Sequence, residues 1–125
     1  MEQLNALQSA LLEKLLSVEF DGVFELRRQL KFARVQNRNV SEKFASFAIN
    51  VDASSAPRSS ANGIPVEGLA KDDNDADVEF LLFVEGGYMS ELEVVKYTEH
   101  VKLDSIEVSD IKVMTRDQRR EYEKT

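Results

Sequence analysis

Apolar residues at the start of the chain recur at intervals of three and four positions, the spacing of one face of an α-helix. They are Leu4, Leu7, Leu11, Leu12, Leu15 and Val18. This pattern predicts a helix over residues 2–17. Residues 19–22 break the pattern, and Asp21 is a candidate N-cap for a second, shorter helix over residues 23–30. The alternative for this second segment is a longer loop that leads directly into a sheet.

From Phe32 onward, apolar and polar residues alternate, which is typical of strands with one buried face. The alternation predicts a hairpin of two strands, over residues 33–36 and 45–51. The sequence Asn37-Arg38-Asn39 between them favours a turn, because asparagine side chains hydrogen-bond to nearby backbone and tolerate left-handed conformations.

The middle of the chain predicts a loop, a strand and a turn. Residues 52–63 are rich in Ser, Ala and Asn and indicate a surface loop rather than a domain linker. A third strand is expected over residues 64–69, with Pro65 at a strand start or a sheet edge, because proline cannot donate to a ladder. Residues 71–77 form an acidic turn. Further on, residues 103–113 indicate one more strand or an irregular packing segment.

The strongest hairpin signal is the pair Gly86-Gly87 between two alternating segments, residues 79–85 and 88–97. A regular two-residue turn places Leu81 opposite Leu92. The face expected in the core then carries Leu81, Phe83, Leu92 and Val94, together with Phe47 and Ile49 of the earlier hairpin. The opposite face carries Phe80, Leu82, Val84 and Met89 mixed with Glu91 and Glu93. A one-residue bulge would reverse these assignments.

These elements predict an α+β fold with one or two N-terminal helices packed on a mainly antiparallel sheet of about five strands. We expect a single domain over residues 1–115 and a solvated tail over residues 116–125. A chain of 125 residues with 42% hydrophobic residues can bury a core without cross-links, and it contains no cysteine. Neither a secretory leader nor a membrane-spanning run of apolar residues is recognisable, so we expect a cytoplasmic protein without a membrane partner.

Charge is unevenly distributed along the chain. Residues 67–110 contain thirteen Asp and Glu against three Lys and Arg, whereas the flanking segments are close to balanced and the whole chain carries a net charge of −7. Phosphate binding needs clustered Lys and Arg, so nucleic acid is not expected as the direct partner. The acidic segment favours a basic protein partner. The alternative is that the acidity serves solubility alone.

The residue inventory argues against an enzyme, a metal protein or a cofactor-binding protein. His100 is the only histidine, and no serine stands in a nucleophile-elbow context, so we interpret His100 as a surface or structural residue. Asp73, Asp75 and Asp77 alternate as in the first half of a calcium-binding EF-hand loop. Valine residues occupy that loop's glycine position and its closing acidic position, so we expect a solvated turn with no metal.

Two parts of the chain resemble small, functionally uncharacterised bacterial α+β proteins. The first, residues 83–97, has the Gly-Gly-Tyr turn, the following Leu-Glu pair and the later tyrosine of their hairpin. The second comprises Leu26-Arg27-Arg28-Gln29-Leu30, Ala33-Arg34-Val35 and residues 44–51. Some proteins of this kind are similar to immunity proteins of contact-dependent inhibition and other polymorphic toxin systems. The resemblance implies a protein that masks a cognate toxin domain.

The sequence therefore predicts a non-enzymatic binding protein, an immunity protein that neutralises a bacterial toxin by occluding it, with no oligomeric state implied. The alternative is a housekeeping interaction module or a homo-oligomeric module that is acidic only for solubility. An enzyme is the third hypothesis. The expected partner-binding residues are the acids of the turn and of the glycine hairpin, namely Asp72, Asp73, Asp75, Asp77, Glu91 and Glu93.

Overall fold

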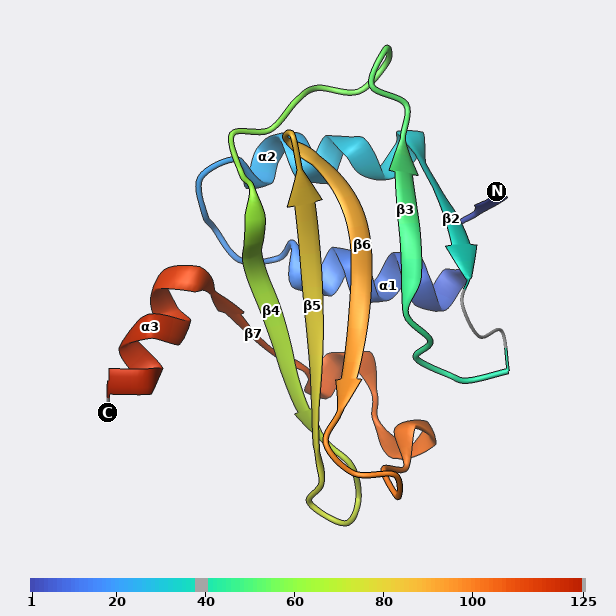
Figure 1. Cartoon of the computed structure of the whole chain (residues 1–125), viewed down its shortest axis with the longest axis vertical. Coiled ribbons are helices and arrows are strands. Elements are labelled where there is room, and N and C mark those ends of the chain that lie inside the picture. The colour runs from blue at the N-terminus through green and yellow to red at the C-terminus, as the bar shows by residue number, and fades with distance from the viewer. Residues whose placement is uncertain (38–40, 125) are drawn as a thin grey trace.

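The computed structural model describes residues 1–37 and 41–124, and within them the chain forms three α-helices and one seven-stranded sheet (Figure 1). The helices are α1 (Ala6–Leu15), α2 (Val23–Gln29) and α3 (Arg116–Lys124). The strands are β1 (Glu2–Gln3), β2 (Ala33–Asn37), β3 (Phe47–Val51), β4 (Gly63–Lys71), β5 (Asp77–Glu85), β6 (Tyr88–Lys96) and β7 (Lys112–Thr115). Neighbouring strands are all antiparallel, in the order β1-β2-β3-β6-β5-β4-β7. The predicted α+β class is confirmed, with more strands than the expected five.

The first helix is shorter than predicted because Asn5 caps it. The Asn5 side chain accepts a hydrogen bond from the Gln8 backbone N–H, and the Gln8 side chain accepts one from the Asn5 backbone N–H. This reciprocal capping box fixes the helix start. Glu2 and Gln3, which we expected to be helical, instead pair with β2 as a short edge strand.

The second helix is confirmed, but Asp21 is not its N-cap. Gly22 occupies that position with a φ of 91°, in the left-handed region that glycine enters without steric cost. A side chain on Gly22 would also overlap the Ser59 hydroxyl, which donates to the Gly22 carbonyl oxygen over 2.7 Å. Close approach of the 52–62 loop therefore decides which residue precedes the helix.

The hairpin of β2 and β3 is confirmed, with Val35 opposite Ile49. Asn37 is the last residue of β2, and the other two residues of the expected turn, Arg38 and Asn39, lie outside the described residues. The segment after β3 runs over the surface in part only, because Ala56, Ser59 and Ala61 are buried. These small residues let the loop lie against the body of the protein.

Strand β4 begins as expected around Pro65. This proline lies in the register shift between Gly63 and Val66, before the first residue that pairs with β7. Its missing N–H therefore leaves no gap in the ladder with β7. The strand continues to Lys71, which is opposite Asp77.

The glycine hairpin has the predicted turn and a bulge beyond it. Glu85 lies opposite Tyr88, but Val84 is opposite Met89 and Phe83 is opposite Glu91, so Ser90 is an extra residue on β6. The bulge shifts the register so that Leu92 lies opposite Leu82 instead of Leu81.

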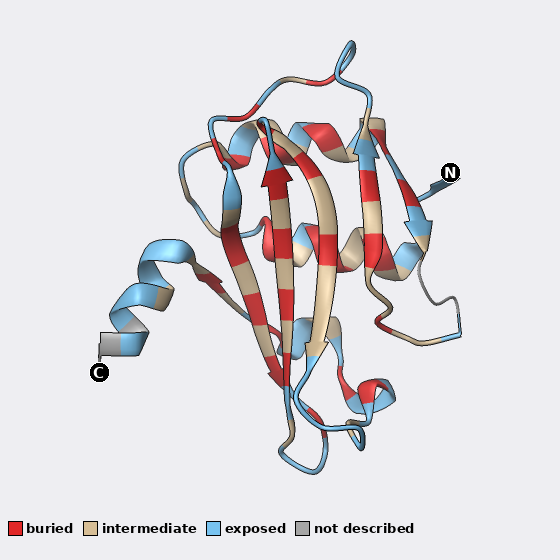
Figure 2. Ribbon diagram, in the orientation of Figure 1, coloured by how far each residue is buried: buried red, intermediate tan, exposed pale blue. Residues whose placement is uncertain are grey.

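This register corrects the predicted core face. Phe80, Leu82 and Val84 are buried, whereas Leu81 and Phe83 are only half-buried on the other face. Figure 2 shows the alternation along β5. Of the other residues expected in the core, Phe47, Ile49 and Leu92 are buried, and Val94 is half-buried against the core.

Helices α1 and α2 cover one face of the sheet, which we call the inner face (Figure 1). Leu11, Leu12 and Leu15 of α1 and Leu26 of α2 are buried there with the inward residues of the strands. The segment between β6 and β7 closes the same face, because Ile111 and Leu15 both approach Gly68 so closely that a larger residue would not fit. No helix within the described residues is both long enough and apolar enough to cross a membrane.

The opposite face, which we call the outer face, is covered only at one side by α3 (Figure 1). We expected residues 116–125 to be a solvated tail. Residues Arg116–Lys124 instead form α3, which begins where the Gln118 backbone N–H donates to the Thr115 hydroxyl and the Gln118 side chain accepts from the Thr115 backbone N–H. This cap is local, and the sequence pattern Thr-x-x-Gln is its signal.

Candidate functional site

The outer face of the sheet carries four glutamates on three adjacent strands. Glu67 on β4 and Glu93 on β6 both lie opposite Leu81, while Glu79 on β5 and Glu91 on β6 belong to the neighbouring rows. Side chains of directly opposed residues share a face, so all four carboxylates lie on the face away from α1 and α2. Successive members occupy diagonal or next-but-one positions, and we call this set the glutamate diagonal: Glu67, Glu79, Glu93 and Glu91.

Apolar side chains alternate with these carboxylates. Leu69, Leu81, Phe83 and Val95 lie on the same face, and each is half-buried rather than covered. Glutamate and large apolar residues thus form a mixed surface on β4, β5 and β6. Carboxylates and partly exposed apolar side chains therefore lie side by side on this face.

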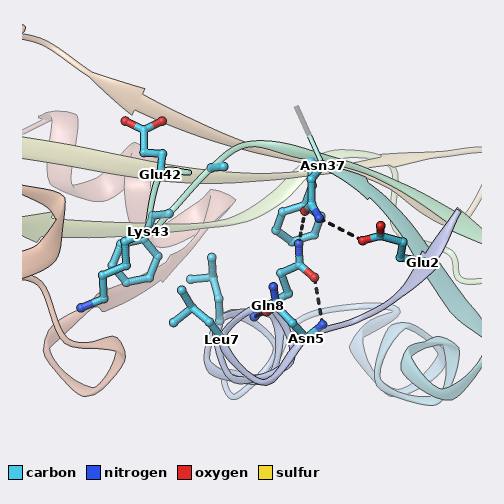
Figure 3. Close-up of a pocket in the computed structure, with 11 residues that line it drawn as sticks. Glu2, Asn5, Leu7, Gln8, Asn37, Glu42 and Lys43 are labelled. Carbon is cyan, nitrogen blue, oxygen red and sulfur yellow. Dashed lines mark hydrogen bonds between the residues drawn. The ribbon is translucent and has the colours of Figure 1, made fainter. Parts of the chain in front are cut away.

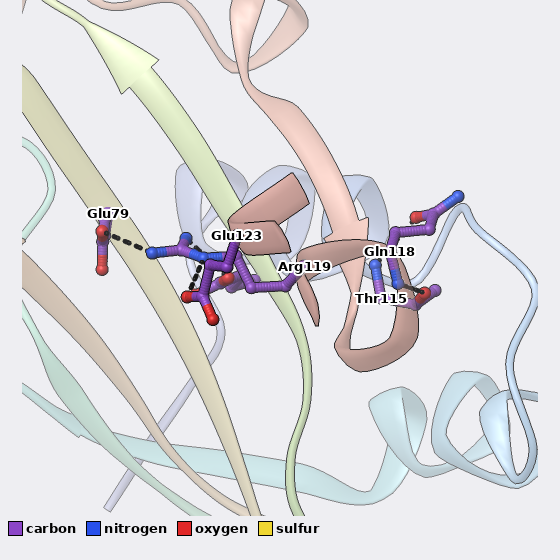
Figure 4. A network of polar contacts seen from close by, with 6 residues as sticks. Glu79, Thr115, Gln118, Arg119 and Glu123 are labelled. Carbon is purple, nitrogen blue, oxygen red and sulfur yellow. Dashed lines mark hydrogen bonds and ion pairs between the residues drawn. The ribbon is translucent and has the colours of Figure 1, made fainter. Parts of the chain in front are cut away.

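Arg119 of α3 occupies one end of the glutamate diagonal (Figure 4). Its guanidinium is 2.7 Å from a carboxylate oxygen of Glu67, 3.6 Å from Glu79 and 2.9 Å from Glu123. The two sheet glutamates are the less exposed partners, with side-chain exposures of 12% for Glu67 and 15% for Glu79. A guanidinium therefore links two carboxylates that are largely withdrawn from water.

Burial is the main influence on the pKa of Glu67, the glutamate that Arg119 contacts most closely. Burial raises the pKa of the Glu67 carboxyl above its usual range, and the Arg119 charge opposes the increase. Tyr97, the residue after β6, also belongs to this cluster. A hydrogen bond with the Glu79 carboxylate raises the pKa of its phenol. Glu79 thus interacts with both a guanidinium and a phenol.

A groove of about 630 Å³ lies beside Arg119. Leu69 and Glu79 line it from the outer face, and Lys71, Asp77 and Lys112 line it from the ends of the strands. The groove extends the site from the arginine toward the acidic turn.

The predicted acidic residues do not form one set. Glu91 and Glu93 lie on the outer face as expected, and Asp77, the first residue of β5, lies on the same face. Asp73 and Asp75 are exposed in the turn between β4 and β5, and Lys71 forms ion pairs with Asp75 over 3.7 Å and Asp77 over 2.8 Å. Part of the turn's charge is therefore neutralised by a lysine of the same hairpin.

Asp72, another of the predicted partner-binding residues, has a structural role in the turn. It is buried, and its Oδ1 accepts hydrogen bonds from the backbone N–H groups of Asn74 and Ala76 while its Oδ2 accepts one from Lys102. These hydrogen bonds, led by that of Lys102, lower the pKa of the Asp72 carboxyl. The sequence Asp-Asp-Asn-Asp indicated this structural role, because an aspartate that accepts a hydrogen bond from the backbone two residues ahead is typical of tight turns.

Sequence reasoning missed Glu67, Glu79, Tyr97 and Arg119 as members of the site. Glu67 and Glu79 were visible as polar positions of alternating strands, but their adjacency depends on the β4–β5 register. Arg119 lay in the expected tail, and only the position of α3 brings it to the sheet.

A second depression lies where α1 begins (Figure 3). It has a volume of about 260 Å³ and is lined by the capping pair Asn5 and Gln8 together with Asn37 and Glu2. These polar groups bond to one another: Gln8 donates to Asn37, and Asn37 donates to Glu2 over 3.4 Å. The network ties α1 and β1 to β2, so we assign it a structural role.

His100 is exposed in the turn after β6. Within the described residues, no group of three or more His, Cys, Asp or Glu side chains has the arrangement of a metal site. Comparisons with protein-family models, with curated proteins and with solved structures find no match to this chain. The candidate site is therefore defined by its geometry alone, as a mixed acidic and apolar surface whose Glu67 and Glu79 pair with Arg119 of the same chain.

Proposed function

We propose that this chain is a non-enzymatic binding protein, an immunity protein that neutralises a cognate bacterial toxin domain by occluding it. The outer face of the sheet is its recognition surface, and a basic protein segment is its ligand. The observation that carries the proposal is the glutamate diagonal, interleaved with half-buried apolar residues and engaged at one end by Arg119.

The chemistry of the face supports this role. Glu91 and Glu93 lie two residues apart on β6, toward the part of the face that is farther from α3. Carboxylates of this kind attract a basic partner over long distances and raise the rate of association, an advantage for a protein that must capture a toxin in the cytoplasm soon after synthesis. Phe83 and Leu81, which lie opposite Glu91 and Glu93, supply the apolar contact that slows dissociation of the partner.

The resemblance of the glycine hairpin to small bacterial proteins that include immunity-like members also supports the proposal. In this chain the hairpin β5–β6 forms the centre of the outer face, so the resembling segment and the proposed surface coincide.

The test uses the protein encoded by the gene adjacent to this one. Wild type and the double variant Glu91→Lys/Glu93→Lys are compared for association rate with that protein across a range of ionic strength. We expect the double variant to associate about 10-fold or more slowly at low salt, with a weaker salt dependence. Cells that express the toxin should survive with wild type and not with the double variant.

The matched control is Glu13→Lys/Asp21→Lys, which makes the same change in net charge on the side of α1 and α2. Both residues are exposed there. It should retain an association rate close to that of wild type. Equal rates for wild type and both double variants at low salt, or an adjacent gene product that does not bind, would contradict the proposal and favour acidity for solubility alone.

A further inference from the structure

The contacts that the described side chains of α3 make with β4, β5 and the 52–62 loop are ion pairs and a hydrogen bond. Its sequence is Arg-Asp-Gln-Arg-Arg-Glu-Tyr-Glu-Lys, and among its described side chains only Arg119 is withdrawn from solvent. A helix of this length is marginal in water by itself and is stabilised by its contacts with the rest of the protein. The polar contacts of the described side chains therefore contribute to the stability of α3 in its observed position.

Arg119 supplies the central one of these contacts. It bridges α3 to Glu67 on β4 and to Glu79 on β5. Arg116, the first residue of α3, donates to the Asn62 carbonyl oxygen. Glu67 and Glu79 are poorly exposed, so their carboxylates are costly to leave without a cation. Whatever removes α3 must offer a cation in exchange.

We infer that α3 is a removable cover of the recognition surface: Arg119 occupies the Glu67–Glu79 pair in the free protein, and an arginine of the bound partner replaces it. The inference rests on the proposed function and specifies the partner's chemistry. The partner presents an arginine-bearing segment, and that arginine binds between β4 and β5.

Arginine suits this position better than lysine. The observed guanidinium uses three different nitrogen atoms for Glu67, Glu79 and Glu123, and a planar fork of this kind satisfies two carboxylates at once. A lysine ammonium is a compact charge without that geometry. The groove beside Arg119, with Leu69 in its wall, provides space for the residues that flank the partner's arginine.

Occupation by Arg119 weakens the apparent affinity for a competing arginine. When only a fraction of molecules has the site open, the apparent dissociation constant rises by the inverse of that fraction. Minor states of proteins are commonly populated at about 0.1–10%. Removing Arg119 should therefore strengthen binding by about 10-fold or more.

The experiment uses the full chain and a fluorescent hexa-arginine peptide as the probe, with binding followed by anisotropy. Arg119→Ala is compared with Arg120→Ala, which makes the same charge change on an exposed residue of the same helix. We expect Arg119→Ala to bind the probe about 10-fold or more tightly than Arg120→Ala. The gain should disappear in Arg119→Ala/Glu67→Gln and should be smaller for a hexa-lysine peptide. Equal affinities for the two arginine variants would overturn the inference.

Hydrogen exchange on the wild-type chain gives a second readout that needs no variant to fold. Saturation with hexa-arginine should speed the exchange of backbone amides in Arg116–Lys124, whereas unchanged protection of α3 at saturation would also overturn the inference. Neither measurement uses a toxin. A failed immunity role would leave these results intact, and a fixed α3 would leave the effect of Glu91→Lys/Glu93→Lys intact, so the two proposals fail separately.

Discussion

Leu82 of β5 and Leu92 of β6 lie directly opposite each other, and both are fully buried beneath the helices. Their pairing follows from the single extra residue, Ser90, whose hydroxyl donates to the Phe83 carbonyl oxygen over 3.2 Å. The bulge places Leu92 on the inner face and Glu91 and Glu93 on the outer face. One inserted residue thus determines which residues of β6 lie in the core and which lie on the outer face.

The two phenylalanines of β5 should differ sharply in their contribution to stability. Phe80 is fully buried and packs edge-on against Phe44 with ring centroids 5.2 Å apart, whereas Phe83 is half-buried on the outer face. We expect Phe80→Ala to lower the free energy of unfolding by about 3–5 kcal/mol. Phe83→Ala should cost about 1 kcal/mol. Urea denaturation of both variants measures the difference, and similar losses would contradict the face assignment.

Gln29 should be a strong determinant of stability although it is polar. It is fully buried, its amide nitrogen donates to the carbonyl oxygens of Pro57 and Gly87, and its oxygen accepts from the Met89 backbone N–H. Gln29→Leu keeps the size but leaves these groups without partners, so we expect a loss of about 3 kcal/mol. Gln36→Leu, at an exposed position of β2, is the control and should change stability by less than about 0.5 kcal/mol. Denaturant melts that cannot separate the two variants would be inconsistent with this role.

The two glycines of the hairpin turn should tolerate substitution differently. Both have positive φ angles, 59° at Gly86 and 87° at Gly87, but a side chain at Gly86 would meet open space while one at Gly87 would overlap the backbone of Ser59. Gly86→Ala should cost about 1–2 kcal/mol for the left-handed conformation. Gly87→Ala adds steric overlap and should cost about 3 kcal/mol or more. Thermal melts test the order, and the reverse order would mean that the 52–62 loop does not lie against the turn.

Asp72 should make stability sensitive to acid. Hydrogen bonds from the backbone of Lys102, Ala76 and Asn74 lower the pKa of its carboxyl in the folded protein. The folded-state pKa is thus below the unfolded value, so the stabilisation is present above about pH 4 and is lost as the pH falls through the lower folded value.

The variant Asp72→Asn tests this expectation. It should be less stable than wild type near pH 7, because its amide NH₂ cannot accept the bonds that the second carboxylate oxygen accepts. The difference between the two proteins should shrink as the pH falls below the ordinary aspartate pKa of about 3.9 and through the lower folded-state value. The urea midpoint measured at several pH values follows it, with the exposed neighbour variant Asp73→Asn as the control. A gap that stays constant down to low pH would rule out the carboxylate as the source.

Local signals in the sequence were sufficient for helices α1 and α2 and for most of the strands. The three-and-four spacing of Leu11, Leu12 and Leu15 specifies a buried helix face, and Gly86-Gly87 specifies a tight turn, because both depend only on residues close together in the chain. Strand β1 was not predicted, and residues 103–113, expected as one more strand or an irregular segment, form two short 3-10 turns and the start of β7. Strands of two to four residues carry too little periodicity to be recognised. Their pairing is determined by the neighbouring strands.

The residues that meet on the acidic outer face could be predicted from the sequence only in part. The sequence by itself determined that residues 67–110 are acidic, that Glu91 and Glu93 share a strand face and that a turn precedes β5. Only the tertiary structure decided that the face is the outer one, that Asp72 is buried, and that Glu67 and Glu79 meet Arg119 from about 40 or more residues away along the chain. The physical reason is that strand faces depend on register, which one bulge shifts, and that the ion pairs of Arg119 join residues far apart in the chain and leave no local pattern.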